Sequence, residues 1–267
     1  MLNSLIILGC RGSVPCSGKQ YTGYGTATTC FALRMGGKLI FIDAGTGLLN
    51  CSEYMSAADK SADILMTHSH ADHVMGLPLC GPALDKDFEI SVYLKTRGEF
   101  SAKEQVEAYL SEPTWPVGTD KLPAKFSFFD MPEEFRLGDI TVKAMDCVHP
   151  GGCSMLRIEG CGKTVVIATD AVLKPGEWGA ELEFAKGADI LIADGQYSPA
   201  EFKEKYFFGH SSWVGAAEFG RECGASRTII VHHDPFRSDA KLDAAAEEIK
   251  MVNHTASLGR EGEVIEL

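Results

Sequence analysis

The stretch of sequence that decides the fold follows the apolar run Ile64–Met66 and reads Thr67-His68-Ser69-His70-Ala71-Asp72-His73. Histidine nitrogens and carboxylate oxygens are ligands that zinc and iron accept, at about 2.0–2.2 Å. In extended or turning backbone, His68 and His70 project to the same side. We expect the chain to bend into a helix next, which brings Asp72 and His73 round to the same cavity. This stretch alone therefore predicts two ligands for each of two adjacent metal ions.

The other histidines have similar surroundings. The chain has eight histidines, and all but His254 stand at the end of an apolar run or in a loop flanked by glycine or proline, beside an aspartate or another histidine. A histidine in a hydrophobic core usually stands alone among apolar neighbours. The pattern therefore predicts a polar site assembled from strand ends, to which the later part of the chain adds His149, His210, His232 and His233.

Short apolar runs rich in β-branched residues alternate with helical patterns along the chain. Strands are predicted at Leu5–Leu8, Cys30–Arg34, Leu39–Ile42, Ile64–Met66, Ile90–Leu94, Ile140–Ala144, Ser154–Ile158, Thr164–Ala168, Ile190–Ala193 and Thr228–Val231. Helices are predicted at Gly47–Ala57, Ser101–Leu110, Glu181–Ala185, Ser211–Cys223 and Asp239–Val252. Ser101 and Glu104 suit a capping box. Two mixed sheets packed face to face, with helices on both outer sides, fit this order, so we predict one α/β domain over residues 1–267.

The pattern His68-x-His70-x-Asp72-His73 resembles the signature of the metallo-β-lactamase superfamily. Further segments resemble the rest of that superfamily's pattern, in the same order: Phe41-Ile42-Asp43-Ala44-Gly45-Thr46-Gly47, Val148-His149-Pro150, Ala168-Thr169-Asp170 and Val231-His232-His233-Asp234-Pro235. The resemblance covers nearly the whole chain. It implies a four-layer αββα sandwich and a cleft that holds two divalent metal ions; zinc is expected, and manganese or iron also fit.

The resemblance also implies a role for each candidate ligand. One metal ion would be held by His68, His70 and His149, and the other by Asp72, His73 and His232. Asp170 would bridge both ions together with a water or hydroxide. Asp43 would accept a hydrogen bond from a ligand histidine, unless it is simply a turn residue at a strand end. We prefer His232 to His233 because the strand Thr228–Val231 delivers His232 first.

Two further segments point to phosphodiester chemistry. Ile192-Ala193-Asp194-Gly195 and Gly209-His210-Ser211-Ser212-Trp213 resemble motifs of the ribonuclease Z-like phosphodiesterase branch. A helix N-terminus offers free N–H groups to a phosphate. An imidazole there, protonated with help from Asp194, can stabilise phosphoryl charge or protonate the leaving oxygen. The candidate catalytic residues are therefore Asp72, Asp194 and His210. The competing interpretation is that Ser211 caps a helix and His210 is merely its neighbour.

The expected reaction is hydrolysis by a metal-bridging hydroxide, because two cations lower the pKa of a shared water and polarise the bond it attacks. That mechanism serves phosphate esters, thioesters and lactams alike. Asp194 and His210 favour a phosphodiesterase; the alternative is a thioester hydrolase resembling glyoxalase II, or a lactam hydrolase. Ribonuclease Z carries a long arm that grips transfer RNA, and no insertion of that kind is apparent between Asp170 and Asp194. The expected substrate is therefore a small or cyclic phosphodiester or nucleotide.

Two loops remain ambiguous. Leu8–Pro15, followed by Gly23–Thr29, resembles a loop that approaches the active-site mouth in the same branch, where Arg11 either meets a substrate phosphate or is a solvated surface charge. Glu112–Pro132 contains four of the eleven prolines and is predicted to be an irregular insertion over a sheet edge, either a lid or a plain connecting loop.

The overall composition restricts the partners. With 25 basic and 37 acidic residues, the chain carries a formal charge of -12, which disfavours long nucleic acid and leaves a small anionic substrate allowed beside bound cations. No apolar run approaches the roughly 20 residues that cross a bilayer, and the N-terminus up to Leu8 looks like a strand with no basic leader. Nine scattered cysteines without a Cys-x-x-Cys pair suit a cytoplasmic protein. A homodimer is compatible with these features.

Overall fold

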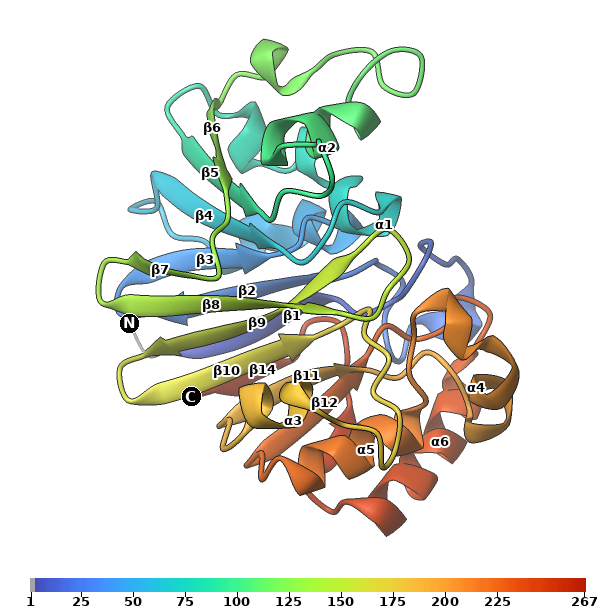
Figure 1. The fold of residues 1–267 in the computed structure, drawn as a ribbon. Coiled ribbons are helices and arrows are strands. Elements are labelled where there is room, and N and C mark those ends of the chain that lie inside the picture. The colour runs from blue at the N-terminus through green and yellow to red at the C-terminus, as the bar shows by residue number, and fades with distance from the viewer. Residues whose placement is uncertain (1–2) are drawn as a thin grey trace.

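The computed structural model describes residues 3–267; Met1 and Leu2, part of the N-terminal stretch discussed above, lie outside the described residues. Two seven-stranded mixed sheets pack face to face, and helices cover their outer faces (Figure 1). The predicted α/β sandwich of four layers is therefore confirmed. None of the helices formed by residues 3–267 has the length and apolarity that crossing a membrane requires.

The first sheet is built mainly from the N-terminal half of the chain. Its strand order is β14 (Val264–Glu266), β1 (Ser4–Gly9), β2 (Cys30–Met35), β3 (Lys38–Ile42), β4 (Ser61–Met66), β5 (Glu89–Leu94) and β6 (Lys125–Asp130). Strands β3 to β6 run parallel to one another, whereas β14, β1, β2 and β3 pair antiparallel.

The second sheet repeats this arrangement with the C-terminal half. Its order is β13 (Ala256–Leu258), β12 (Arg227–Val231), β11 (Ile190–Asp194), β10 (Lys163–Ala168), β9 (Cys153–Gly160), β8 (Ile140–Cys147) and β7 (Glu134–Leu137). Strands β10 to β13 are parallel and β7 to β10 antiparallel. Each sheet therefore has one parallel part, and the carboxyl ends of neighbouring parallel strands meet at one edge.

The central strands, such as β1 and β12, are apolar on both faces because the middle of each sheet is covered on both sides. In β1, Leu5 and Ile7 contribute to the layer between the sheets, whereas Ile6 and Leu8 pack into the outer layer of the first sheet. In β12, Ile229 faces the layer between the sheets and Ile230 faces the helices. Such runs read as continuous apolar stretches, and all ten predicted strands are confirmed.

The helices are α1 (Ala71–Val74), α2 (Ala102–Tyr109), α3 (Ala180–Ala185), α4 (Pro199–Lys205), α5 (Trp213–Glu222) and α6 (Asp239–Val252). Short 3-10 turns occur at Lys19–Tyr21, Leu77–Leu79, Pro82–Leu84, Thr119–Lys121 and Tyr206–Phe208. The capping box of Ser101 and Glu104 is present at α2. The predicted helix at Gly47–Ala57 is instead a nine-residue 3-10 segment, Thr46–Tyr54.

The interpretation of Glu112–Pro132 as an irregular insertion is wrong for its second half. Lys125–Asp130 forms β6, the edge strand of the first sheet, and pairs in parallel with β5. The prolines bracket this proline-free run of six residues without interrupting it. An edge strand tolerates exposed side chains, so β6 lacks the apolar continuity by which the buried strands were recognised. Strands β7, β13 and β14 and helix α4 were not predicted either.

Candidate metal centre

The segment after β4 turns as the sequence predicts. His68 and His70 lie in the extended stretch between β4 and α1, and the helix begins at Ala71 with His70 as its N-cap. This bend carries Asp72 and His73 round toward His68, whose ring lies 4.3 Å from that of His73, centroid to centroid. His73 and His68 are almost fully buried, whereas His70 is exposed. His70 therefore marks the solvent side of the site.

The backbone is strained at several residues of the site that lie at or near the ends of the other strands. Five residues other than glycine have a positive φ within residues 3–267, and four of them lie at the site. Two directly follow a strand, Asp43 after β3 (φ 58°) and His232 after β12 (φ 60°), and Asp170 (φ 54°) lies two residues after the end of β10. The fourth is Ser13 (φ 65°), whose backbone N–H donates to Asp72 Oδ2 at 2.7 Å. Such residues cost about 1–3 kcal/mol each and concentrate at functional sites.

The structure gathers the predicted ligands into the predicted groups. Ligand atoms lie within 4.8 Å of one another in the trio His68, His70 and His149. The same holds for the trio Asp72, His73 and His232, and for Asp170 grouped with His68 and His73. Asp170 thus combines with one histidine from each trio, as a carboxylate shared between two ions must.

Most of these atoms are spaced as ligands of a shared cation would be, and one pair, His232 Nε2 and Asp72 Oδ2, is also within hydrogen-bond distance. His73 Nε2 lies 3.4 Å from Asp72 Oδ2 and 3.2 Å from Asp170 Oδ2. His232 Nε2 lies 3.3 Å from Asp72 Oδ2 and 3.2 Å from Asp170 Oδ1, and His68 Nε2 lies 3.8 Å from that same oxygen. Two ligands at tetrahedral positions about 2.0–2.2 Å from one ion are separated by roughly 3.3–3.6 Å.

Unsatisfied polar atoms give an independent test of this fit. His68 Nε2, His73 Nε2 and Asp170 Oδ2 are buried and have no hydrogen-bond partner within residues 3–267. A buried polar atom without a partner costs about 1–3 kcal/mol. Three such atoms in one small cluster, all of metal-ligating types, fit divalent cations that these residues would hold.

The ring orientation of most candidate ligand histidines is fixed from behind through Nδ1. Nδ1 of each contacts an acceptor at 2.9–3.1 Å and leaves Nε2 toward the cluster. The acceptors are Thr67 Oγ1 for His68, Asp43 Oδ2 for His73, the Gly209 carbonyl for His149 and Gln196 Oε1 for His232. Such contacts select the tautomer whose Nε2 lone pair can bind a metal. Neither Thr67 nor Gln196 was identified from the sequence. The only sequence features that could have indicated them are the position of Thr67 next to His68 and that of Gln196 two residues after Asp194.

Asp43 organises the half of the site built on the first sheet. Its fully buried carboxylate accepts hydrogen bonds from the backbone N–H of Thr67 (2.8 Å), the Thr67 hydroxyl and His73 Nδ1 (2.9 Å). The expected contact between Asp43 and a histidine of the cluster is therefore present. The Thr67 hydroxyl also contacts His68 Nδ1, so Asp43 orients residues of both trios.

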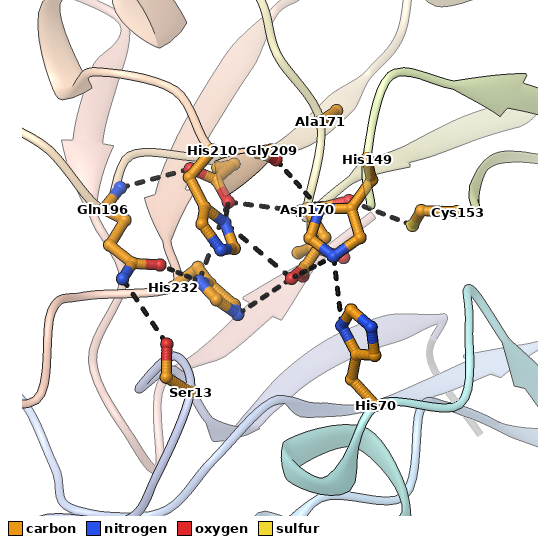
Figure 2. A network of polar contacts seen from close by, with 12 residues as sticks. Ser13, His70, His149, Cys153, Asp170, Ala171, Gln196, Gly209, His210 and His232 are labelled. Carbon is orange, nitrogen blue, oxygen red and sulfur yellow. Dashed lines mark hydrogen bonds and ion pairs between the residues drawn. The ribbon is translucent and has the colours of Figure 1, made fainter. Parts of the chain in front are cut away.

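Asp194 has the corresponding place in the second sheet. Its buried carboxylate accepts the backbone N–H groups of Asp170 (3.2 Å), Gln196 (3.2 Å) and Ser211 (2.8 Å). It also accepts His210 Nδ1 at 2.8 Å, so the predicted pairing of Asp194 and His210 is present. Figure 2 shows His210 beside His232. His210 Nε2 makes no hydrogen bond to residues 3–267 and stays available to a ligand.

The carboxylates around His232 make the site attractive to positive charge. Burial opposes protonation of this histidine, but Asp170, Asp72 and Asp194 outweigh it and raise the pKa of His232 to about 9. His233 is different: burial lowers its pKa to about 3, and its neutral ring donates from Nε2 to the Gly259 carbonyl at 2.9 Å. The structure thus places His232 in the cluster and His233 outside it.

Both interpretations of Arg11 are wrong. Its side chain is fully buried and donates to the carbonyl oxygens of Gly25, Asp234 and Arg237 at 2.8–3.3 Å. A guanidinium has five N–H donors, so one buried arginine can hold several chain segments together. Arg11 therefore fixes the N-terminal loop, and the nearby backbone N–H of Ser13 is the group of this loop that reaches the cluster.

The start of α5 also differs from the expectation. The N-cap is Ser212, whose hydroxyl accepts the Gly215 N–H, and the Trp213 N–H donates to the Tyr197 carbonyl. These N–H groups are therefore not free to bind a phosphate. Ser211 is not a cap: its hydroxyl donates to the Ala171 carbonyl and accepts the Leu173 N–H. This pairing joins the segment that carries His210 to the loop after Asp170.

Comparison with known proteins agrees with this geometry. A family model, the beta-lactamase superfamily domain, matches residues 38–233. The probable metallo-hydrolase YhfI of Bacillus subtilis is 23% identical over 253 aligned positions, which cover 88% of this chain and 91% of that protein. A ribonuclease Z of Treponema pallidum (strain Nichols) is 21% identical over 308 positions, covering 96% of this chain and 94% of that protein.

Solved structures show the same fold over the whole chain. The crystal structure of YhfI matches with a TM-score of 0.74 at 20% identity and covers 99% of both chains. A diphosphatase from the PhnP family matches with a TM-score of 0.70 at 16% identity, over 99% of this chain and 98% of that one. Because the beta-lactamase superfamily model matches residues 38–233, the chain belongs to the metallo-β-lactamase superfamily, as a hydrolase whose His/Asp cluster is able to bind metal ions.

Proposed function

We propose that this protein is a phosphodiesterase that uses two divalent metal ions, with zinc as the expected metal, to hydrolyse a small or cyclic phosphodiester. His68, His70 and His149 would hold one ion, Asp72, His73 and His232 the other, and Asp170 would contact both. When bound, such ions supply an ionised water near neutral pH and polarise the bond under attack. The remaining steps depend on the chain's own side chains.

The observation that carries the proposal is the place of His210. Its ring stacks on His232 with centroids 4.8 Å apart and meets His149 edge-on at 5.2 Å, so it stands beside candidate ligands of both ions. Asp194 accepts Nδ1–H and so fixes the orientation of the ring. When Nε2 carries a proton, it can donate to a phosphoryl oxygen as negative charge develops, or protonate the leaving oxygen.

Other residues of the site hold the candidate metal ligands in position. Asp72 receives the backbone N–H of Ser13 on the same oxygen that faces His73 and His232. The N-terminal loop therefore keeps this carboxylate turned toward the cluster. Asp43 and Gln196 hold the rings of His73 and His232 from behind. Candidate ligands fixed in this way need little reorganisation when the reaction begins.

The preference for a small substrate rests on charge and chain length. The formal charge of -12 opposes a long phosphate backbone. In the alignment with ribonuclease Z of Treponema pallidum, 308 positions take in 96% of this chain's 267 residues, so about 50 of those positions face gaps in this chain. That ribonuclease Z thus has segments for which this protein has no counterpart.

The test is a substrate comparison on purified protein loaded with zinc. We expect hydrolysis of bis-p-nitrophenyl phosphate or a cyclic nucleotide, loss of activity after dialysis against EDTA, and recovery when zinc, manganese or iron(II) is added. A thioester and a cephalosporin serve as the competing substrates. Protein with two ions bound that cleaves the thioester or the cephalosporin and ignores every phosphodiester would contradict the proposal.

A further inference from the structure

A cavity of about 230 Å³ adjoins the segments that carry three cluster residues. Its lining includes Val148, which directly precedes His149, and Val172, two residues after Asp170. Tyr206, in the segment that leads to His210, forms another part of the wall. Hydrogen bonds of His149 Nδ1 to the Gly209 carbonyl and of Ser211 to the loop after Asp170 tie these segments together. The wall of the cavity is therefore built from the same three segments that carry His149, Asp170 and His210.

The wall of this cavity combines aromatic and aliphatic side chains with the charged side chains of Lys174, Glu177 and Glu181. Trp178 lines it and packs edge-on against Phe219 with centroids 5.7 Å apart, so its ring is held in place. Val148 is 65% exposed and Tyr206 46% exposed, although both lie next to the segments of the site. Exposed apolar side chains beside a polar site commonly contact a ligand.

The size and rim also restrict the occupant. An apolar cavity of about 150 Å³ is enough to bind benzene in another protein, so this cavity has room for one aromatic ring. Lys174 lines it as well, with Nζ 2.6 Å from Glu177 and 5.9 Å from the centroid of the Tyr206 ring. The charged rim offers polar contacts to heteroatoms at the ring's edge.

We propose that this cavity is a substrate subsite for a flat aromatic group attached to the phosphate, held against Tyr206, Val148 and Trp178 while the phosphate lies at the metal cluster. The inference rests on the proposed phosphodiesterase function and adds a substrate class to it: phosphodiesters with an aromatic substituent. Contacts with the aromatic group would then orient the phosphate relative to His210.

A pair of phosphonates that the enzyme does not hydrolyse tests the subsite. Phenylphosphonate and methylphosphonate share the anion and differ in the ring. We expect zinc-loaded wild-type protein, measured by isothermal titration calorimetry, to bind phenylphosphonate at least about 10-fold more tightly. Tyr206→Ala and Val148→Ser should lose most of this preference and keep the affinity for methylphosphonate. Leu84→Asp, at another exposed apolar side chain, is the matched control.

Three outcomes decide the proposal. Equal affinities of the wild type for the two phosphonates overturn it, and so does a preference for the phenyl compound that both cavity variants retain. A preference lost in both variants and kept in Leu84→Asp supports it. Because this measurement needs no turnover, it separates the two proposals: a preference for the phenyl ring without any phosphodiester hydrolysis leaves the subsite standing and refutes only the proposed function.

Discussion

Two buried aspartates, one from each sheet, hold the two halves of the site. Asp43 follows β3 and Asp194 ends β11; both are fully buried, and both accept Nδ1 of a histidine, at 2.9 and 2.8 Å. The halves thus use the same device, a strand-end carboxylate that orients an imidazole. They differ in what the far nitrogen of that imidazole faces.

In the first half, His73 Nε2 is buried, without a hydrogen-bond partner, between Asp72 and Asp170. In the second half, His210 is 8% exposed and its Nε2 is open to a ligand. Under the proposed function, the first imidazole would bind a metal and the second would meet a substrate. On this proposal, the surroundings of Nε2, more than the aspartate behind the ring, decide the role of the histidine.

The largest expected effect is at the point where the halves meet. Asp170→Ala should lower phosphodiester turnover at least about 10³-fold and reduce the metal content below two ions per chain, because one carboxylate faces both trios. Elemental analysis and steady-state kinetics measure the two effects. Asp139→Ala, at an exposed aspartate between β7 and β8, is the control. Full metal content in Asp170→Ala would show that each half holds its ion alone.

The second largest expected effect is the difference between variants of His73 and of His210. His73→Ala should lose metal, whereas His210→Ala should keep it and lose about 10²–10³-fold in kcat on a phosphodiester. Elemental analysis distinguishes the two variants directly. Loss of metal from His210→Ala would break the comparison, since His210 also lies within ligand distance of Asp170, Asp194 and His232.

The two aspartates themselves sharpen the comparison. Asp43→Asn should weaken metal affinity about 10–100-fold, because the acceptor behind His73 loses its charge. Asp194→Asn should leave metal affinity closer to that of the wild type and lower the rate, because the ring it orients faces the substrate. Competition with a zinc chelator measures the first effect and kcat the second. Equal loss of zinc affinity in both variants would contradict the division of roles.

A smaller effect on metal affinity should distinguish Thr67 from Thr169, two buried threonines that each precede a candidate ligand. The Thr67 hydroxyl contacts both Asp43 and His68, whereas the Thr169 hydroxyl has no hydrogen-bond partner within residues 3–267. Thr67→Val should weaken metal affinity about 10-fold. Thr169→Val should leave the affinity unchanged, because no hydrogen bond is lost. Chelator titration of both variants is the measurement, and an equal effect would exclude the role given to Thr67.

The smallest effect concerns the stability of the first half. Arg34 contacts Asp59 through two hydrogen bonds, which hold the pKa of this carboxyl at about 2 against 3.8 ordinarily. Because the folded pKa is lowered, the stabilisation is present above about pH 4 and is lost as the pH falls through 2. Asp59→Asn should cost about 1–2 kcal/mol at pH 7 and little at pH 2.

Urea unfolding at both pH values measures this difference. Glu247→Gln removes an exposed ion pair on α6 in the second half and should change stability by less than about 0.5 kcal/mol. A loss in Asp59→Asn that does not depend on pH would show that the effect is not electrostatic.

The sequence was informative where a local pattern corresponds to a physical constraint. All ten predicted strands are present; most are apolar runs buried on both faces, and β5 and β8 show the alternation of a strand with one buried face. The edge strand β6 was not predicted because its side chains are largely exposed. Arg11 was misread because a lone arginine in a glycine-rich loop looks the same whether it is buried or solvated. Its buried carbonyl partners come from distant parts of the chain.

By itself the sequence determined the fold and the identities of the gathered residues, since ligand types at strand ends are encoded locally. The tertiary structure alone decided which atom of each residue faces the cluster. His232 and His233 are neighbours in the chain, yet the left-handed backbone at His232 turns one ring toward Asp72 and Asp170, while the other donates to the Gly259 carbonyl. Gln196 acquires its place in the site because packing brings its Oε1 against Nδ1 of His232, 36 residues away in the chain. Contacts between segments far apart in sequence leave no local pattern, so only the packed sheets could reveal them.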